Sequence, residues 1–193
     1  MTKQDFDSTC SCFKLADLLA KNSTNQTRKL LKTFSCAKNA DVQDFLHNKA
    51  ITFERNLRSC TYLYTSNADK SVIGYFSIGI TYTLTNKLDK AVVKFLDGYT
   101  DESIAIPCYL VGQLGKNDTY KHKIGNYLLT DALSIIDRAQ DSLKGRFVLI
   151  DAVNEPKVLE FYKENSFIAI ENSTSNKSVK MVKPYFEYSE FKI

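Results

Sequence analysis

The feature of this sequence that most constrains its fold is a pair of short apolar segments joined by a basic loop and a long amphipathic segment. The first apolar run, residues 106–114, is too short for a comfortable helix and contains Pro107 near its start, so we predict a buried strand. Apolar residues then recur at helical spacing from Ile124 to Ala139, and residues 145–153 predict a second buried strand. The helix therefore crosses between two strands of one sheet, as in α/β proteins.

The remaining segments add helices and strands to this sheet. Asp41 opens the clearest of the earlier helices, in which apolar residues keep helical spacing as far as Phe53. Pro156 fixes the backbone φ angle at the first position of another helix. Weaker patterns predict helices at 15–19 and 28–34 and strands at 60–65, 72–84, 167–171 and 179–188. We expect one mixed sheet with helices crossing between its strands.

Length and composition indicate a folded protein of one domain. The chain has 193 residues, of which 44% are hydrophobic and 25% are charged, and both values are typical of globular proteins. It has no internal repeat, and its prolines and glycines do not gather into a linker. No apolar stretch reaches the length of a membrane span, and the first residues lack a secretory signal pattern. We therefore expect a cytoplasmic protein with no membrane contact.

The cysteines, histidines and overall charge argue against several kinds of chemistry. The five cysteines are an odd number at irregular spacing, so we expect no disulfide framework. Cys10 and Cys12 have no second Cys or His pair at a suitable spacing, so we expect no metal site. His47 and His122 offer no catalytic triad pattern. The formal net charge of +4 permits an anionic ligand without requiring one.

The basic loop ahead of the crossing helix is a candidate anion site. Lys121, His122 and Lys123 lie just before the helix start, where backbone N–H groups have no partner within the helix. Gly125 allows the backbone to approach a ligand closely. The chain lacks a P-loop pattern and the GxGxxG dinucleotide fingerprint. On spacing alone, an ordinary solvated crossover loop remains the alternative.

Residues 110–167 resemble the cofactor-binding half of the GNAT acyltransferase family. Residues 110–114 are similar to its splayed strand, 120–125 to its pyrophosphate loop and 146–153 to its fifth strand. Residues 154–167 contain Phe161-Tyr162 and Phe167, which resemble the F-Y-x-x-x-x-F ending of its last helix. The family's loop usually reads Q/R-x-x-G-x-G/A, and this chain departs from it because Lys123 takes the place of the first glycine.

The resemblance continues upstream, toward a GNAT subgroup that contains toxins acetylating aminoacyl-tRNA. Phe34-Ser35-Cys36 is similar to the subgroup's F-x-C opening, and residues 42–53 and 61–75 to its first long helix and hairpin. The resemblance implies an α/β GNAT fold whose single mixed, mostly antiparallel sheet of about six to seven strands is flanked by helices. Residues 1–33 would then form an N-terminal helical and loop segment, and residues 34–193 the GNAT domain.

The resemblance also implies acetyl-CoA as cosubstrate, with no metal, and assigns residues to it. Tyr162 would protonate the departing thiolate as general acid, because a phenol is still protonated at neutral pH. Asn154 would contact the pantetheine arm or the acceptor. Backbone amides near Leu114 and Gly115 would face the thioester oxygen. The remaining cofactor-binding residues would be Lys116, Lys121, His122, Lys123, Ile124, Gly125 and Asn126.

The acceptor amine stays open at this stage. Clusters of basic residues could neutralise tRNA phosphates, so the amino group of aminoacyl-tRNA is one acceptor, with an antitoxin as a further partner. The alternatives are a small amine or a protein lysine or N-terminus, and, in a different class, a non-catalytic module that keeps the fold. No carboxylate stands out as general base, which favours a weakly basic amine. The chain would be a monomer or a homodimer.

Overall fold

The computed structural model describes residues 2–170 and 177–186 and divides the chain into two compact units. One unit consists of residues 1–79 and 112–138, and the other of residues 80–111 and 139–193. The division expected at residue 33, between an N-terminal segment and a main domain, stays a prediction.

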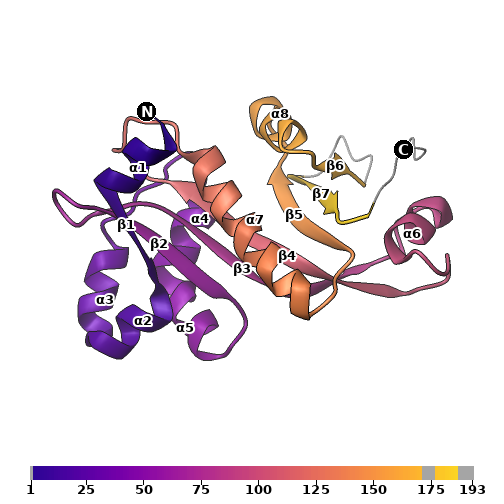
Figure 1. Cartoon of the computed structure of the whole chain (residues 1–193), viewed down its shortest axis with the longest axis horizontal. Helices are drawn as coiled ribbons and strands as arrows, with labels where there is room; N and C mark the ends of the chain where they lie inside the picture. Colours follow the sequence, from indigo (N-terminus) through magenta and orange to yellow (C-terminus); the bar gives the residue numbers. More distant parts are fainter. Residues whose placement is uncertain (1, 171–176, 187–193) are drawn as a thin grey trace. The chain divides into compact units, whose positions relative to one another are not determined.

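The first unit contains the N-terminal helices and strands together with the helix that follows the basic loop (Figure 1). Its helices are α1 (Lys3–Thr9), α2 (Leu15–Lys21), α3 (Thr24–Leu31), α4 (Ala40–Asp44), the π-helical segment η1 (Phe45–Lys49), α5 (Ala50–Arg55) and most of α7 (Gly125–Ser142). Its strands are β1 (Cys10–Lys14), β2 (Cys60–Ser66), the first part of β3 (Val72–Leu84) and the end of β4 (Ala105–Lys116).

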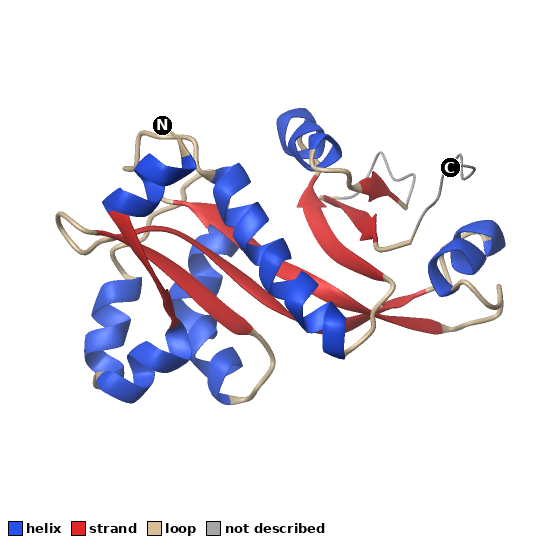
Figure 2. Ribbon diagram, viewed as in Figure 1, coloured by secondary structure: helices blue, strands red, loops and turns tan. Residues whose placement is uncertain are grey.

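Strand β2 separates two layers of helices in this unit. It pairs in antiparallel fashion with β1 on one side and β3 on the other, with Cys12 opposite Tyr64 and Tyr64 opposite Gly74. Successive side chains of a strand point to opposite faces. Leu63 accordingly joins the core formed with α2 to α5, while Tyr64 stacks on Phe6 of α1. That core consists of Leu15, Leu31, Phe34, Val42, Phe45, Leu46, Ala50, Ile51, Leu63, Val72 and Tyr75. Figure 2 shows helices on both faces of the strands of this unit.

The helix expected over residues 41–55 is present, but it is not regular. Its middle turn is π-helical, and the N–H of Ala50 donates to the carbonyl of Phe45, five residues earlier. A π turn inserts one extra residue into the helical repeat. As a result Val42 and Phe45 before the insertion and Ala50 after it all reach the same buried core. The expected strands at 60–65 and 72–84 are confirmed as β2 and β3.

In the second unit, the two strands predicted before and after the crossing helix pair with each other, and the pair is parallel. This unit contains the end of β3, most of β4, and the elements α6 (Lys90–Asp97), β5 (Phe147–Val153), α8 (Pro156–Glu164), β6 (Ile168–Ala169) and β7 (Ser178–Pro184). Tyr109 of β4 pairs with Val148 of β5 in parallel, and Leu149 of β5 pairs with Val182 of β7 in antiparallel fashion. Within the described residues, the order of the seven strands is β1-β2-β3-β4-β5-β7-β6.

The sequence pattern predicts neither α1, β1 nor α6, and two predicted strands are longer than the observed ones. Val92, Val93 and Leu96 of α6 are buried in the core of the second unit. Strand β1 lies in the segment for which only helices and a loop are expected. The last strand, expected to run to residue 188, ends at Pro184, and residues 187 and 188 lie outside the described part of the chain. Strand β6 is shorter than the expected strand at 167–171, and residue 171 also lies outside the described part of the chain.

None of the helices in the described part of the chain has the length and hydropathy that crossing a bilayer requires.

Candidate functional site

The basic loop between β4 and α7 is exposed in its middle and buried at its end. Lys121, His122 and Lys123 are exposed, whereas Ile124, the next residue, is only 1% exposed. Among the described residues, none of the three exposed basic side chains takes part in an ion pair. These side chains are therefore available to an anion that approaches the start of α7.

A glycine in β3 seats the first turn of α7. A Cβ added to Gly74 would lie 3.0 Å from Cδ1 of Ile124 and 3.0 Å from Cδ1 of Leu128. Leu128 is fully buried, and its N–H donates to the carbonyl of Ile124 as the helix begins. The absence of a side chain at Gly74 thus lets α7 begin close to the sheet, with its N-terminal end directed at the basic loop.

The end of β4 also packs closely against the N-terminal helices. A Cβ on Gly115 would lie 2.5 Å from Cγ1 of Val42 and 3.1 Å from Cζ of Phe34. Gly115 is buried and Leu114 is half-buried. The backbone at these two residues, which was assigned to the thioester oxygen, therefore packs against the core. β4 continues to Lys116, beyond its parallel pairs with β5 at Tyr109 and Leu110.

Lys116 has a different environment from the other basic residues of the loop. Its Nζ donates to the carbonyl of Asn117 at 3.0 Å and to the carbonyl of Tyr120. Both acceptors belong to the loop itself, so Lys116 braces the turn from within. Its assignment to the pyrophosphate stays a prediction, but two of its three donors already have protein acceptors.

The lysine that replaces the usual loop glycine does not strain the backbone. Among the described residues, the positive φ angles of non-glycine residues occur at Leu57, Lys70 and Ser166. Lys123 therefore adopts a backbone conformation that any L-amino acid tolerates, and glycine is not required at this position. The rings of Tyr120 and His122 lie 5.5 Å apart in an edge-to-face contact, which orders the preceding part of the loop.

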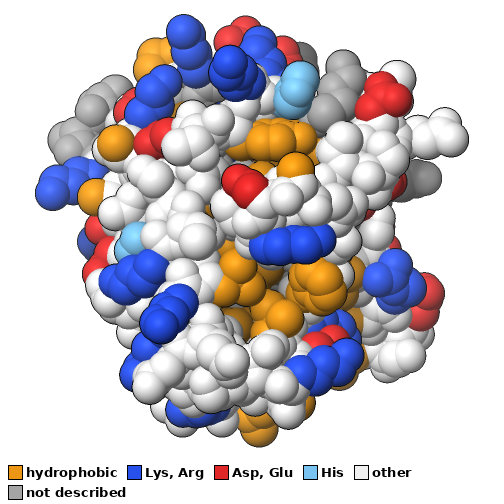
Figure 3. Space-filling model, turned by 90° about the vertical axis from the view of Figure 1, so that its left-hand side faces the viewer, with side chains coloured by type: hydrophobic (Ala, Val, Ile, Leu, Met, Phe, Trp, Pro, Cys, Tyr) orange, Lys and Arg blue, Asp and Glu red, His pale blue; other side chains and the backbone are white. Residues whose placement is uncertain are grey.

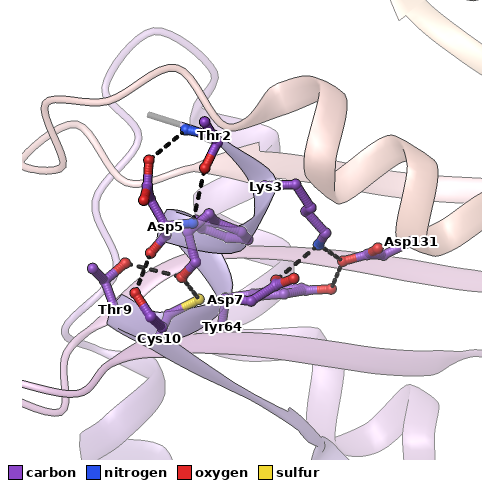
Figure 4. Close-up of polar contacts among 10 residues, drawn as sticks. Thr2, Lys3, Asp5, Asp7, Thr9, Cys10, Tyr64 and Asp131 are labelled. Carbon is purple, nitrogen blue, oxygen red and sulfur yellow. Dashed lines mark hydrogen bonds and ion pairs between the residues drawn. The ribbon is translucent and has the colours of Figure 1, made fainter.

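Helix α1 is attached to one side of helix α7 through Asp131 (Figure 4). The carboxylate of Asp131 accepts hydrogen bonds from the Tyr64 hydroxyl and from Nζ of Lys3, each at 2.6 Å. Burial alone would lower the pKa of Lys3, but its hydrogen bonds to Asp131 and Asp7 raise it. Burial, followed by the bond to Asp131, raises the pKa of Tyr64. The side chain of Asp131 thus joins α1, β2 and α7 through these hydrogen bonds.

Two of the residues that the sequence analysis assigns to the reaction, Asn154 and Tyr162, belong to the second unit. Asn154 directly follows β5, and its N–H donates to the carbonyl of Lys177 at 3.0 Å. Tyr162 lies on α8, where its ring contacts those of Phe161 at 5.0 Å and Phe167 at 5.6 Å. Burial raises the pKa of Tyr162 to about 12. The phenol is therefore protonated throughout the physiological pH range and can act only as a proton donor.

The sequence did not single out Asn117, the first residue after β4, although the structure gives it a central place. Its side chain is 1% exposed and makes hydrogen bonds to three separate segments of the first unit. The available signal was an Asn-Asp pair directly after a buried strand, because these residues favour turns that hydrogen-bond the backbone.

Basic side chains elsewhere on the protein lie in separate groups. On the side of the molecule shown in Figure 3, some Lys and Arg side chains lie next to one another and others beside Asp and Glu, with apolar and uncharged surface between these groups. Arg28, Lys29 and Lys32, from α3 and the residue after it, are exposed. The five cysteines are free thiols, and the described residues contain no cluster of His, Cys, Asp and Glu suited to a metal ion.

Comparison with known proteins shows the fold. No protein-family model and no curated protein sequence matches the chain. Three solved structures that match it are AtaT complexed with acetyl-methionyl-tRNAfMet, AtaTR bound with acetyl-CoA, and a tyrosine-to-phenylalanine mutant of KacT. Their TM-scores are 0.66, 0.64 and 0.68, and their sequence identities 20%, 18% and 15%. Each alignment covers 91% of this chain and 94%, 94% and 95% of the other. The expected GNAT fold, with its mixed and mostly antiparallel sheet, is thereby confirmed.

Proposed function

We propose that this protein is an N-acetyltransferase that transfers the acetyl group of acetyl-CoA to the amino group of aminoacyl-tRNA. The observation that carries the proposal is the exposed basic triplet Lys121-His122-Lys123, which forms no ion pair with the described residues and lies one residue before the N-terminus of α7. Further support comes from the fold that the chain shares with AtaT, which is known in complex with acetyl-methionyl-tRNAfMet, and with AtaTR bound with acetyl-CoA.

The residues of the loop fit the chemistry of the cosubstrate. A diphosphate requires cations and backbone N–H donors, and a basic loop that opens a helix supplies both. We assign Lys121, His122, Lys123, Ile124, Gly125 and Asn126 to this group; the side chain of Ile124 is buried, so Ile124 contributes its backbone. When bound, acetyl-CoA supplies an activated acetyl thioester. Asn154 is assigned to its pantetheine arm or to the acceptor.

The chain's own groups then have two tasks in the transfer. Backbone N–H groups at Leu114 and Gly115 donate hydrogen bonds to the oxygen on which negative charge develops. The Tyr162 hydroxyl donates toward the sulfur that leaves. Full proton transfer from a phenol with a pKa of about 12 to a thiolate of pKa about 8.5 is uphill by about 5 kcal/mol. We therefore expect Tyr162 to act by a hydrogen bond that strengthens as charge builds on sulfur.

The pKa of the acceptor favours an aminoacyl ester over a lysine side chain. Removing a proton from lysine at pH 7 costs about 4.6 kcal/mol, whereas an α-amino group of pKa about 7.7 costs about 1 kcal/mol. No carboxylate in the sequence stands out as a general base, and Asp97 of α6 already accepts hydrogen bonds from Ser103 and Thr100. An acceptor amine with a low pKa can lose its proton without a strong general base, and such an amine is therefore favoured.

An acetylation assay with three acceptors tests the proposal. Purified protein is incubated with labelled acetyl-CoA and with charged tRNA, polyamines or lysine peptides. We expect label on charged tRNA, and its release when the aminoacyl ester is hydrolysed by mild alkali. Label on peptides or polyamines only would refute the tRNA acceptor. No label, together with no binding of acetyl-CoA by calorimetry, would indicate the non-catalytic module instead.

Two features of the cellular setting follow from this proposal. Aminoacyl-tRNA and acetyl-CoA are cytoplasmic, so the enzyme would act there. Since AtaT is also known bound to the C-terminus of the antitoxin AtaR, we propose an antitoxin partner for this chain. Expression of the wild-type chain without a partner should then arrest bacterial growth, and Tyr162→Phe should relieve the arrest. Growth unaffected by the wild type would argue against a toxin.

A further inference from the structure

The turn that leads from β4 into the basic loop is organised around one buried amide side chain. Asn117 follows the last residue of β4 and is 1% exposed. Its Nδ2 donates to the carbonyl of Val72 at 2.7 Å and to the carbonyl of Thr33 at 2.9 Å. Its Oδ1 accepts from the N–H and the hydroxyl of Thr119, at 3.1 Å and 3.0 Å. The amide thus uses both donors and both acceptor positions.

The backbone around Asn117 is tied to the same neighbours. The N–H of Asn117 donates to Ile73 at 2.9 Å, and its carbonyl accepts from the N–H of Tyr120 at 3.1 Å. At Asp118, the N–H donates to Ser35 at 2.8 Å, and the carboxylate accepts from the N–H of Ala37 at 2.6 Å. The start of the loop is therefore attached both to the beginning of β3 and to the segment that follows α3.

The far end of the loop is fixed by the packing of one buried side chain. Ile124 is buried against Gly74 of β3, only two residues along the strand from Val72. One short stretch of β3 therefore anchors both ends of the loop, Asn117 through its amide and Ile124 through its side chain. Between these anchors the basic side chains of Lys121, His122 and Lys123 stay exposed.

We propose that Asn117 is a positioning residue for cosubstrate binding, which fixes the path of residues 118–124 so that their amides and cations meet the diphosphate. The proposal rests on the function proposed above. Asn117 is buried and does not itself touch the cosubstrate, so it acts through the loop. Because a diphosphate bound at the loop is held equally in the ground state and the transition state, losing this order should change KM for acetyl-CoA and not kcat.

Substitutions of Asn117 should weaken the binding of acetyl-CoA. Asn117→Ala leaves the carbonyls of Thr33 and Val72 and the N–H of Thr119 without their partner. We expect KM and Kd for acetyl-CoA to rise about tenfold or more, with kcat at saturation within about twofold of wild type. Asn117→Asp keeps the acceptors but turns a carboxylate oxygen toward two carbonyls, and should have the same effect. Thr119→Val removes one hydrogen bond and should raise KM about twofold to threefold.

Gln140→Ala is the matched control. Gln140 is also a carboxamide that bridges a loop, donating to the carbonyl of Gly145 and accepting from its N–H, each at 2.7 Å. It lies near the C-terminal end of α7, away from the basic loop. Gln140→Ala should lower the melting temperature, as the Asn117 variants do, and leave KM for acetyl-CoA unchanged. The comparison separates a carboxamide that anchors the basic loop from one that stabilises a different turn.

Hydrogen–deuterium exchange gives a readout that does not depend on activity. Amides of residues 118–125 should exchange at least about tenfold faster in Asn117→Ala than in wild type. Unchanged exchange and unchanged KM in a folded variant would overturn the proposal. If Asn117→Ala does not fold, Thr119→Val decides, and an unaltered KM there would also overturn it. Failure of the wild type to bind acetyl-CoA would instead refute the proposed function, while loop exchange would still report on Asn117.

Discussion

Replacing Gly115 with alanine tests how closely the backbone of β4 approaches the N-terminal helices. A Cβ at this position would lie 2.5 Å from Cγ1 of Val42 and 3.1 Å from Cζ of Phe34. Carbon atoms pack at about 3.5–4.0 Å, so the Val42 side chain would have to retreat by about 1 Å. Val42 is 7% exposed and Phe34 1%, which leaves little room for this movement. We expect the substitution to lower the free energy of unfolding by about 1–3 kcal/mol.

A double-mutant cycle separates this steric effect from a general loss of packing. Val42→Ala removes the atom that the new methyl group would meet, although alone it leaves a cavity. Urea unfolding followed by circular dichroism measures the free energy of unfolding of the wild type, each single variant and the pair. The double variant should be more stable than the sum of the single effects predicts, by about 1 kcal/mol or more. Additivity within about 0.5 kcal/mol would refute the close approach of β4.

Further predictions concern Tyr162, Tyr64 and Lys123. Tyr162→Phe should lower kcat by about 10²–10⁴-fold with little change in KM, by steady-state kinetics, and an unchanged kcat would remove Tyr162 from the mechanism. Because burial raises the pKa of Tyr162 to about 12, the phenol should cause no decline of kcat up to pH of about 11, whereas a fall centred near pH 10 would indicate an ordinary tyrosine. The same shift should cost the folded state stability as pH rises from about 10, the pKa of an exposed phenol, through about 12, as measured by unfolding at each pH. Tyr64→Phe removes the donor to Asp131 and should lower the free energy of unfolding by about 1.5–3 kcal/mol in urea titrations; no loss would mean that this bond is not formed. Lys123→Gly should weaken acetyl-CoA binding only about twofold to fivefold in calorimetry, since an exposed charge contributes about 0.3–1 kcal/mol, and tighter binding would show that the lysine obstructs the site.

The parts of the fold that the sequence predicts are those in which burial imposes a regular period. Leu128, Ala132 and Ile136 of α7 are buried at helical spacing, and residues 147–150 of β5 form one continuous buried run. Such patterns survive in any context because the element must keep one face, or both, away from water. Helix α6 had a comparable apolar stripe and ends at Gly98, whose φ of 80° suits a helix C-terminus, so it was within reach of the same reasoning.

Strand β1 could not be read in this way, because its stability is not local. Its residues after Cys10 are partly or fully exposed, and the strand exists through its pairing with β2, as between Cys12 and Tyr64. Its position also depends on α1, in which Phe6 is fully buried between the rings of Tyr64 and Tyr127. Contacts between segments so far apart in sequence leave no periodic signal in either of them.

Some residues of the candidate site could be predicted from the sequence and others could not. The exposed basic residues at 121–123 could be predicted, since charge and position before a helix are both written in the sequence. The brace formed by Lys116 could not be predicted, because it binds carbonyl groups whose positions depend on the folded path of the chain. For Asn117, the Asn-Asp pair indicates a turn but does not identify the distant carbonyls of Thr33 and Val72 that its amide binds.

The anchoring of the loop suggests why it tolerates a lysine where the related loops usually have glycine. Glycine is needed where a backbone must adopt a positive φ or pass close to another atom, and in this chain the close approaches lie outside the exposed part of the loop, at Gly74 and Gly115. With both ends of the loop held by β3, the middle has an ordinary backbone conformation and its side chains face solvent. The identity of residue 123 can then change the charge of the loop without changing its backbone geometry. Gly74 lacks this freedom, because a Cβ there would lie 3.0 Å from Ile124 and Leu128.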